Sequence, residues 1–222
     1  MKFMIAIPAY GGSIKNGCVE SLLKLQASLH ARGVSADYGV LNFAGISEAR
    51  NYYASILLQR AEHSHVLFVD SDMAFEAATF WKLVDAQKPL VGCIYPKRKV
   101  NGGFVVYNHG PIRAKNGLAQ VEGVGMGLCL IQAACFRALL NTGQIAKYHR
   151  HAFAPHGLTG PLLGFFDPPP LDGEYSSEDY AFCWRWRTLC SGEVWALASE
   201  DIGHIGEYVY RGKPDVTEWQ RS

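Results

Sequence analysis

Apolar residues in the first half of the chain are spaced as alternating strands and helices. Continuous apolar runs over residues 2–8, 66–69 and 90–94 are typical of buried strands. Residues 36–43 also predict a strand. Apolar residues recur at helical spacing over three intervening segments: 18–31, 47–62 and 76–86. Alternation of this kind is the order of a parallel, doubly wound sheet.

The second half of the chain has a less regular pattern. Strands are expected over four segments: 102–108, 118–123, 127–131 and 194–198. Helices are expected over 133–140 and 177–190. Between them, residues 149–175 hold several glycines and five prolines, at Pro155, Pro161, Pro168, Pro169 and Pro170. This segment predicts a long loop, and we expect one domain over residues 1–222 whose two halves meet near residue 100.

Composition narrows the class of protein. The chain has 222 residues, of which 49% are hydrophobic and 18% charged, so it can bury a sizeable core. A net charge of +1 provides no field for binding nucleic acid or an anionic membrane surface. A polyanionic ligand would therefore have to be held by local groups, and no nucleic-acid partner is expected.

Cysteine usage and the N-terminus predict a cytoplasmic protein. The six cysteines form no CxxC pair and no zinc-finger spacing, which favours buried free thiols in a reducing compartment. The apolar start over residues 1–8 is too short for a signal peptide. No apolar run reaches the roughly 20 residues that a membrane span needs, so no span is expected.

The acidic tripeptide Asp70-Ser71-Asp72 follows a predicted buried strand. Ligands of open α/β sheets bind at the carboxyl ends of the strands. If the chain stays extended, both carboxylates point to the same side and repel each other unless a cation lies between them. Mg²⁺ or Mn²⁺ could then bridge the protein to a diphosphate. The alternative is that both aspartates are turn residues that cap the next helix.

Four segments in this order, 5–10, 48–51, 67–75 and 91–98, resemble GT-A glycosyltransferases. The resemblance is to small viral and bacterial enzymes related to fungal mannosyltransferases, and it covers most of the chain. It implies an α/β GT-A fold with a mostly parallel, Rossmann-like sheet and a smaller antiparallel part. Residues of about 1–100 would form the nucleotide-sugar half, and those of about 101–222 the acceptor half.

The resemblance also implies roles for residues at the nucleotide. Pro8, Ala9 and Tyr10 would line the base, with Tyr10 either stacked on it or packed as a strand-end aromatic. Arg50 would reach phosphate or ribose oxygens, although an exposed helix arginine is the alternative. Ser71 would lie beside the nucleotide sugar.

The same resemblance predicts a metal site. Asp72 would bind Mn²⁺ or Mg²⁺ directly, and Asp70 would contact the metal or the ribose. His204, which follows the last predicted strand, fits a third protein ligand. A lone histidine is more often structural, so this assignment depends on position alone.

A second acidic pair, Glu178-Asp179, precedes an aromatic-rich helix. In the resembled family such a pair faces the acceptor hydroxyl or the donor sugar, and one carboxylate can act as the catalytic base. Asp179 is the first candidate and Glu178 the second. The alternative is a capping box formed by Ser176 and Asp179 at the helix start.

Three further residues are weaker candidates for binding the nucleotide sugar. Gly125 would let the backbone approach the donor, or would mark a bend in a strand. Arg211 and Lys213 would close over the diphosphate as part of a lid, or would belong to a solvated terminus. The cluster at 97–99 is interpreted as a solvated loop.

These residues predict a metal-dependent, hexosyltransferase-like enzyme. It would move a sugar from a nucleotide-diphosphate sugar, UDP-sugars being favoured over GDP-sugars, to a hydroxyl of a carbohydrate or glycoconjugate acceptor. A dehalogenase-type phosphatase would need its D-x-D after the first strand, and a nucleotidyltransferase would need an arginine in the loop after that strand. A non-catalytic sugar-nucleotide- or carbohydrate-binding protein on the same scaffold stays open.

Overall fold

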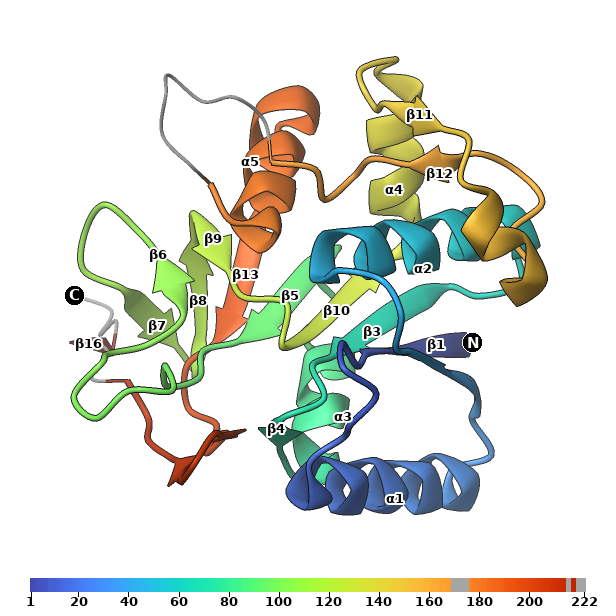
Figure 1. Ribbon diagram of the computed structural model, residues 1–222. Helices are drawn as coiled ribbons and strands as arrows, with labels where there is room; N and C mark the ends of the chain where they lie inside the picture. The colour runs from blue at the N-terminus through green and yellow to red at the C-terminus, as the bar shows by residue number, and fades with distance from the viewer. Residues whose placement is uncertain (169–175, 215–216, 219–222) are drawn as a thin grey trace.

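A computed structural model describes residues 1–168, 176–214 and 217–218, and its helices cover both faces of a central sheet (Figure 1). One face carries α2 (Ile46–Arg60), α4 (Ala133–Asn141) and α5 (Glu178–Cys190). The other face carries α1 (Asn16–Ala31) and α3 (Ala77–Asp85). All five helices predicted from the apolar spacing are confirmed, with ends within two residues of those expected.

Within the described residues, the main sheet has nine strands in the order β16-β7-β8-β13-β5-β10-β3-β1-β2. Their bounds are β1 (Lys2–Pro8), β2 (Ser35–Leu41), β3 (His65–Val69), β5 (Leu90–Cys93), β7 (Arg113–Lys115), β8 (Leu118–Val121), β10 (Leu128–Gln132), β13 (Val194–Leu197) and β16 (Thr217–Glu218). Strands β1, β2 and β3 pair in parallel, whereas β10 is antiparallel to both β3 and β5. Only β8 and β10 run against the other strands of this sheet, so the predicted mostly parallel α/β fold is confirmed.

One feature of the sheet differs from the simple alternation predicted for the first half. Strand β5 is not the neighbour of β3, because β10 from the second half is inserted between them (Figure 1). Every residue of β3 after His65 is buried, as expected for a strand covered on both faces. The sheet therefore joins the two halves of the chain.

Smaller antiparallel pairings complete the fold and confirm the predicted antiparallel part. They are β4 (Met73–Ala74) with β14 (Gly203–Ile205) and β15 (Val209–Tyr210), β6 (Val106–Tyr107) with β9 (Gly123–Val124), and β11 (Lys147–Tyr148) with β12 (Leu162–Leu163). The strand expected over 102–108 is reduced to β6, because Asn101 and Gly103 adopt left-handed backbone angles, with φ of 54° and 73°. The β4–β14 pairing brings the residues after β3 next to those near the C-terminus.

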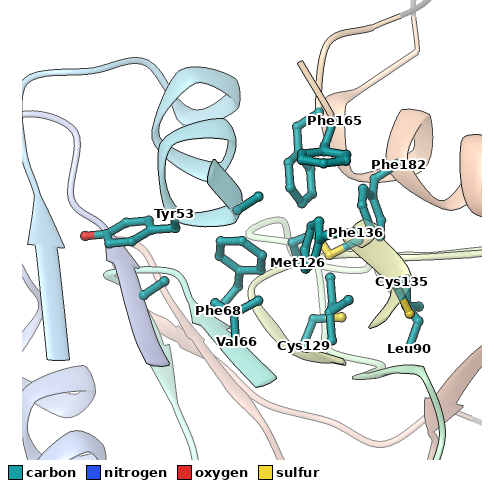
Figure 2. Packing of buried hydrophobic residues seen from close by; sticks show 14 of the residues in the cluster. Tyr53, Val66, Phe68, Leu90, Met126, Cys129, Cys135, Phe136, Phe165 and Phe182 are labelled. Atoms are coloured by element: carbon teal, nitrogen blue, oxygen red, sulfur yellow. The ribbon is translucent and has the colours of Figure 1, made fainter. Parts of the chain in front are cut away.

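The core above the sheet contains a cluster of phenylalanines from distant segments. The ring of Phe136 lies 5.2 Å from that of Phe165 and 5.3 Å from that of Phe182, with all three side chains fully buried (Figure 2). Phe165 belongs to the segment that was expected to be a structureless loop. That expectation is wrong for its described part, which forms a 3-10 helix (His151–His156) and β12 and packs into the core. Pro169 and Pro170 lie outside the described residues.

All six cysteines are reduced, and most of them are buried. Burial raises the pKa of Cys18 and Cys135 to about 12, so these two thiols are poor nucleophiles. Over the residues that the structure describes, no helix combines the length and apolar character that crossing a membrane would require.

Candidate functional site

The acidic tripeptide lies at the carboxyl end of β3, where the chain turns. The backbone N–H of Asp70 donates to the Gly127 carbonyl at 2.9 Å, and that of Met73 donates back to the Asp70 carbonyl at 3.1 Å. Because of this turn, Asp70 faces α2 while Asp72 faces β14. The chain does not stay extended here, so the condition under which both carboxylates would point to one side is not met.

Asp70 is held by a buried arginine. Arg50 lies on α2 with a 2% exposed side chain, and its Nη2 donates to Asp70 Oδ1 at 2.8 Å. The Nη1 of the same guanidinium donates to Glu178 Oε1 at the start of α5. A buried arginine needs such carboxylate partners because an unpaired buried charge is strongly destabilising. Arg50 thus has protein partners in this structure, and its contact with a nucleotide stays a prediction.

The charges in this cluster change the pKa values of its members. Burial alone would lower the pKa of Arg50, but the carboxylates of Asp70 and Glu178 outweigh burial and raise it. Burial also raises the pKa of Glu178, while the positive charge of Arg50 acts in the opposite direction. The arginine therefore stays charged and limits how strongly Glu178 holds a proton.

Asp72 has different partners on the other side of the turn. Its Oδ2 lies 3.5 Å from His204 Nε2 and 2.9 Å from Arg98 Nη1. Burial tends to raise the pKa of Asp72, but the hydrogen bond and charge of His204 and the charge of Arg98 outweigh it, so the pKa is lowered. Asp72 therefore stays ionised, with a partner in Arg98 whose side chain is 55% exposed.

His204 is oriented by the chain around it. Strand β14 pairs with β4, which places His204 opposite Met73, next to Asp72. The Nδ1 atom of His204 lies 2.8 Å from the Pro96 carbonyl oxygen, which can only accept, so Nδ1 carries the proton. A metal ligand binds through an imidazole nitrogen that carries no proton, and with Nδ1 protonated that nitrogen would be Nε2, which lies on the side of Asp72.

Asp72 and His204 therefore fit a divalent cation through one carboxylate oxygen and one imidazole nitrogen. Asp70 does not join them. Among residues 1–168, 176–214 and 217–218, the one group of three acidic, histidine or cysteine ligand atoms within 4.8 Å of one another is Asp37, Glu62 and His63, which includes none of the predicted ligands. The structure thus brings together two of the three residues expected at the metal.

The second acidic pair begins α5, and its two residues differ. Glu178 faces Arg50, whereas Asp179 Oδ1 accepts the N–H of Tyr180 at 2.8 Å and the hydroxyl of Ser177. The helix is preceded by Ser177, without a side-chain cap. The hydroxyl of Ser176 donates to the Ser177 carbonyl at 3.3 Å, and the capping box between Ser176 and Asp179, which was the alternative interpretation of the acidic pair, is not formed.

The predicted base pocket lies where β1 ends. Pro8 is the last residue of β1, and the N–H of Ala9 donates to the Leu41 carbonyl at 2.8 Å, which fixes the exit of the strand. The side chain of Tyr10 is 76% exposed. It is not packed as a strand-end aromatic, so its ring is open to a ligand. Ser71 lies near this loop, because its carbonyl accepts the N–H of Lys15 at 2.8 Å.

Of the three weaker candidates for nucleotide-sugar binding, one is packed in the core and two are exposed. A Cβ atom at Gly125 would lie 2.4 Å from Tyr95 Oη, so packing against Tyr95 is enough to require glycine there. Arg211 and Lys213 are exposed near the C-terminus, and Arg211 Nη1 lies 3.6 Å from Asp201 Oδ2. Contacts of these three residues with a nucleotide sugar stay predictions.

Arg98 is a site residue that sequence analysis missed. It lies in the basic cluster at 97–99, which was interpreted as a solvated loop, yet its guanidinium pairs with Asp72. The pairing depends on contacts across the fold, since Arg98 also lies beside Gly206 after β14, 3.5 Å from where a Cβ of that glycine would be. The sequence signal that could have indicated a site residue is its position shortly after the carboxyl end of β5, where ligands of α/β sheets bind.

Comparisons with known proteins support the fold. No protein-family model matches the chain, and no curated protein matches its sequence. A197 from STIV, a crystal structure, matches 100% of this chain and 99% of its own with a TM-score of 0.56 and 17% identity. This match shows that the two proteins share a fold and agrees with the α/β architecture predicted from the sequence.

Two further solved structures match with lower TM-scores. S. aureus TarS 1–349 in complex with UDP-GlcNAc matches with a TM-score of 0.47 and 17% identity, and this chain spans 60% of it. A glycosyltransferase involved in glycosylation of the major capsid of PBCV-1 matches 65% of this chain and 67% of its own, with a TM-score of 0.34 and 9% identity.

The Arg50 cluster yields a prediction about stability. Replacing Arg50 with methionine leaves two carboxylates without their buried partner, so we expect the free energy of unfolding at pH 7 to fall by about 3–5 kcal/mol. Arg60→Met, at an exposed position of the same helix, should change it by less than about 0.5 kcal/mol. Urea denaturation followed by circular dichroism measures both.

The loss should depend on pH. Burial raises the folded-state pKa of Glu178 above its unfolded value, and removing Arg50 raises it further. The penalty is full above the folded-state pKa and disappears as the pH falls to the unfolded value of about 4.3. A loss that is equally large at pH 7 and pH 4 would contradict this electrostatic role.

Proposed function

We propose that this protein is a metal-dependent glycosyltransferase that moves a sugar from a nucleotide-diphosphate sugar, with a UDP-sugar as the favoured donor, to an acceptor hydroxyl. The observation that carries the proposal is the pair formed by Asp72 and His204, whose ring is oriented by the Pro96 carbonyl. This pair is separated from the Arg50–Glu178 cluster only by the turn that joins Asp70 to Asp72. Each includes an aspartate of the turn after β3, Asp72 in the pair and Asp70 in the cluster, at the carboxyl edge of the sheet where ligands of α/β folds bind.

The donor would lie between the loop after β1 and this turn. The exposed ring of Tyr10 is available to stack on the base, and Pro8 and Ala9 shape the wall beneath it. Asp72 and His204 would hold Mn²⁺ or Mg²⁺, which would neutralise the diphosphate of the bound donor. Asp70, fixed by Arg50, would serve the ribose side of the nucleotide.

Arg98 is suited to bind the diphosphate. Its guanidinium neutralises Asp72 in the ligand-free protein, and its exposed side chain can move without disturbing the core. A cation bound to Asp72 would release Arg98, and a phosphate oxygen would be its natural new partner because guanidinium pairs well with phosphate. The same residue would then balance charge before and after the donor binds.

Asp179 is the proposed catalytic base. It lies half-buried at the start of α5, next to Glu178, whose carboxylate is already committed to Arg50. The acceptor oxygen would form a bond to the anomeric carbon of the sugar while the bond from that carbon to the diphosphate breaks. The hydroxyl proton would pass to Asp179, and the electron pair of the broken bond would leave with the nucleoside diphosphate.

Nucleotide release from a panel of UDP- and GDP-sugars with Mn²⁺ tests the function. We expect release from at least one donor, and its loss on adding EDTA or in the Asp72→Ala variant, because both remove the cation from the diphosphate. Asp85→Ala, an exposed aspartate at the end of α3, is the matched control and should retain full release.

A different result favours the alternative. If a sugar nucleotide raises the melting temperature in a metal-dependent way but is not turned over with any acceptor, the protein is a sugar-nucleotide-binding module. If no sugar nucleotide binds or reacts, with or without metal, the donor site proposed at Asp72 is wrong.

Asp179→Asn tests the base. Asparagine keeps the shape of the side chain but cannot accept the proton, so we expect the transfer rate to fall about 10²–10⁴-fold. Donor binding, measured as the thermal shift with UDP and Mn²⁺, tells whether the variant still forms the donor site. Transfer at the wild-type rate by Asp179→Asn would exclude this role.

Arg98→Ala tests the diphosphate contact. We expect the KM for the donor to rise about tenfold, as for the loss of one charge-assisted hydrogen bond at a partly exposed site. Lys99→Ala removes a neighbouring exposed cation of the same loop, and its KM should change less than twofold. Equal effects of the two substitutions would indicate only a general loss of positive charge.

A further inference from the structure

A cavity of about 490 Å³ opens beside the first turns of α2, away from the Asp72 site. Its volume is within the range of ligand pockets, roughly 300–1,000 Å³. Its walls come from the start of α2, from β11 and Arg150 just after it, and from β12 and Asp167 beyond it. The side chains that give it chemical character are Glu48, Asn51, Tyr148, Arg150, Leu162 and Asp167.

Asp167 is the central polar group of this α2 cavity. Its Oδ1 accepts from Asn51 Nδ2 at 2.7 Å, and its Oδ2 accepts from Tyr148 Oη at 2.7 Å. The structure gives Asp167 no ion pair within 4.0 Å among the residues it describes. A carboxylate fixed by neutral donors keeps lone pairs for further hydrogen bonds, and hydroxyl groups are suitable donors.

The remaining walls favour a neutral ligand with both hydroxyl and C–H faces. The Tyr148 side chain is 43% exposed, and Leu162 adds an apolar surface. Glu48 and Asp167 contribute two negative charges to the lining, and Arg150, which is paired with Glu48, contributes one positive charge. The charge of Arg185, outside the lining, also acts on Asp167 and Tyr148, so the surroundings are close to neutral and give no strong preference for an ion. Aromatic and carboxylate groups together suit a saccharide, whose C–H faces pack on rings.

Helix α2 connects the α2 cavity to the proposed reaction site. Arg50 and Asn51 are consecutive, and the first binds Glu178 while the second binds Asp167. Asn51 Oδ1 also accepts the N–H of Phe166 at 2.8 Å, which fixes the wall to the helix. A ligand in the α2 cavity would thus be held in fixed relation to the acidic pair that begins α5.

We propose that the α2 cavity binds the acceptor as a neutral saccharide, with Asp167 accepting its hydroxyl hydrogen bonds and Tyr148 packing on a sugar face. The assignment of this ligand as an acceptor rests on the proposed function. The presence of a saccharide site does not, because it depends on the cavity alone.

A glycan array probed with fluorescently labelled full-length protein tests the proposal without any sugar nucleotide. We expect the wild-type protein to bind a set of neutral glycans, and Asp167→Asn and Tyr148→Ala to bind them about tenfold more weakly or not at all. His149→Ala is the matched control, since this exposed residue lies between Tyr148 and Arg150 but does not line the cavity, and it should bind as the wild type does. Melting temperatures show whether each variant is folded.

Three results would overturn the proposal: no glycan bound by the wild-type protein, unchanged binding by both cavity variants, or preference for sialylated or phosphorylated glycans. Tyr148 is half-exposed, so its alanine variant should fold even if Asp167→Asn does not. Glycan binding that depends on Tyr148, without nucleotide release from any donor, would refute the proposed function and retain the saccharide site. Nucleotide release without glycan binding would refute the cavity alone.

Discussion

The buried guanidinium of Arg50 is the interaction on which the rest of the site depends. It joins α2 to the end of β3 through Asp70 and to the start of α5 through Glu178, residues 20 and 128 positions away in the chain. Neither bond forms until the three elements pack together, and without them the charge would be buried at a cost of several kcal/mol. The charge of Arg50 is therefore neutralised only when the two halves of the chain are correctly assembled.

The partners of the two aspartates explain why they are not equivalent. Asp70 is bound by an arginine that is 2% exposed, and that partner cannot leave without exposing the core. The arginine bound to Asp72 is 55% exposed, on a loop stabilised by short backbone contacts. A ligand can replace such a partner at little cost. The turn at Ser71 thus separates one aspartate that fixes structure from one that is free to exchange partners.

Local sequence patterns were sufficient for the elements but not for their assembly. The period of apolar residues predicted α5 over 177–190, and the structure has Glu178–Cys190. The insertion of β10 between β3 and β5 could not be predicted in this way, because strand pairing is not a local property. The buried phenylalanines at 153, 165 and 166 did carry a local signal of burial, which the prolines and glycines around them obscured.

Long-range contacts also decided which site residues could be predicted. The resemblance pointed to Asp72 and His204, each of which follows a predicted strand, and their proximity follows from the β4–β14 pairing. The burial of Arg50 was not predicted, because arginine is usually exposed and no sequence period distinguishes a helix that is buried on most sides. Arg98 was missed for a related reason, since its partner Asp72 lies on another part of the fold.

The proposed acceptor site on helix α2 and the proposed donor site at Asp72 differ in rigidity. Residues 49–57 of α2 are all buried, so the helix cannot shift without moving the core, and the spacing between the α2 cavity and Glu178 is fixed. The Asp72 side is built from two-residue and three-residue strands and from an exposed loop. Under the proposed function, an acceptor would therefore meet a preorganised site, whereas binding of a donor and a metal would rearrange Arg98 and its loop. Such a division would let the donor complete its own site while the attacking hydroxyl kept its position.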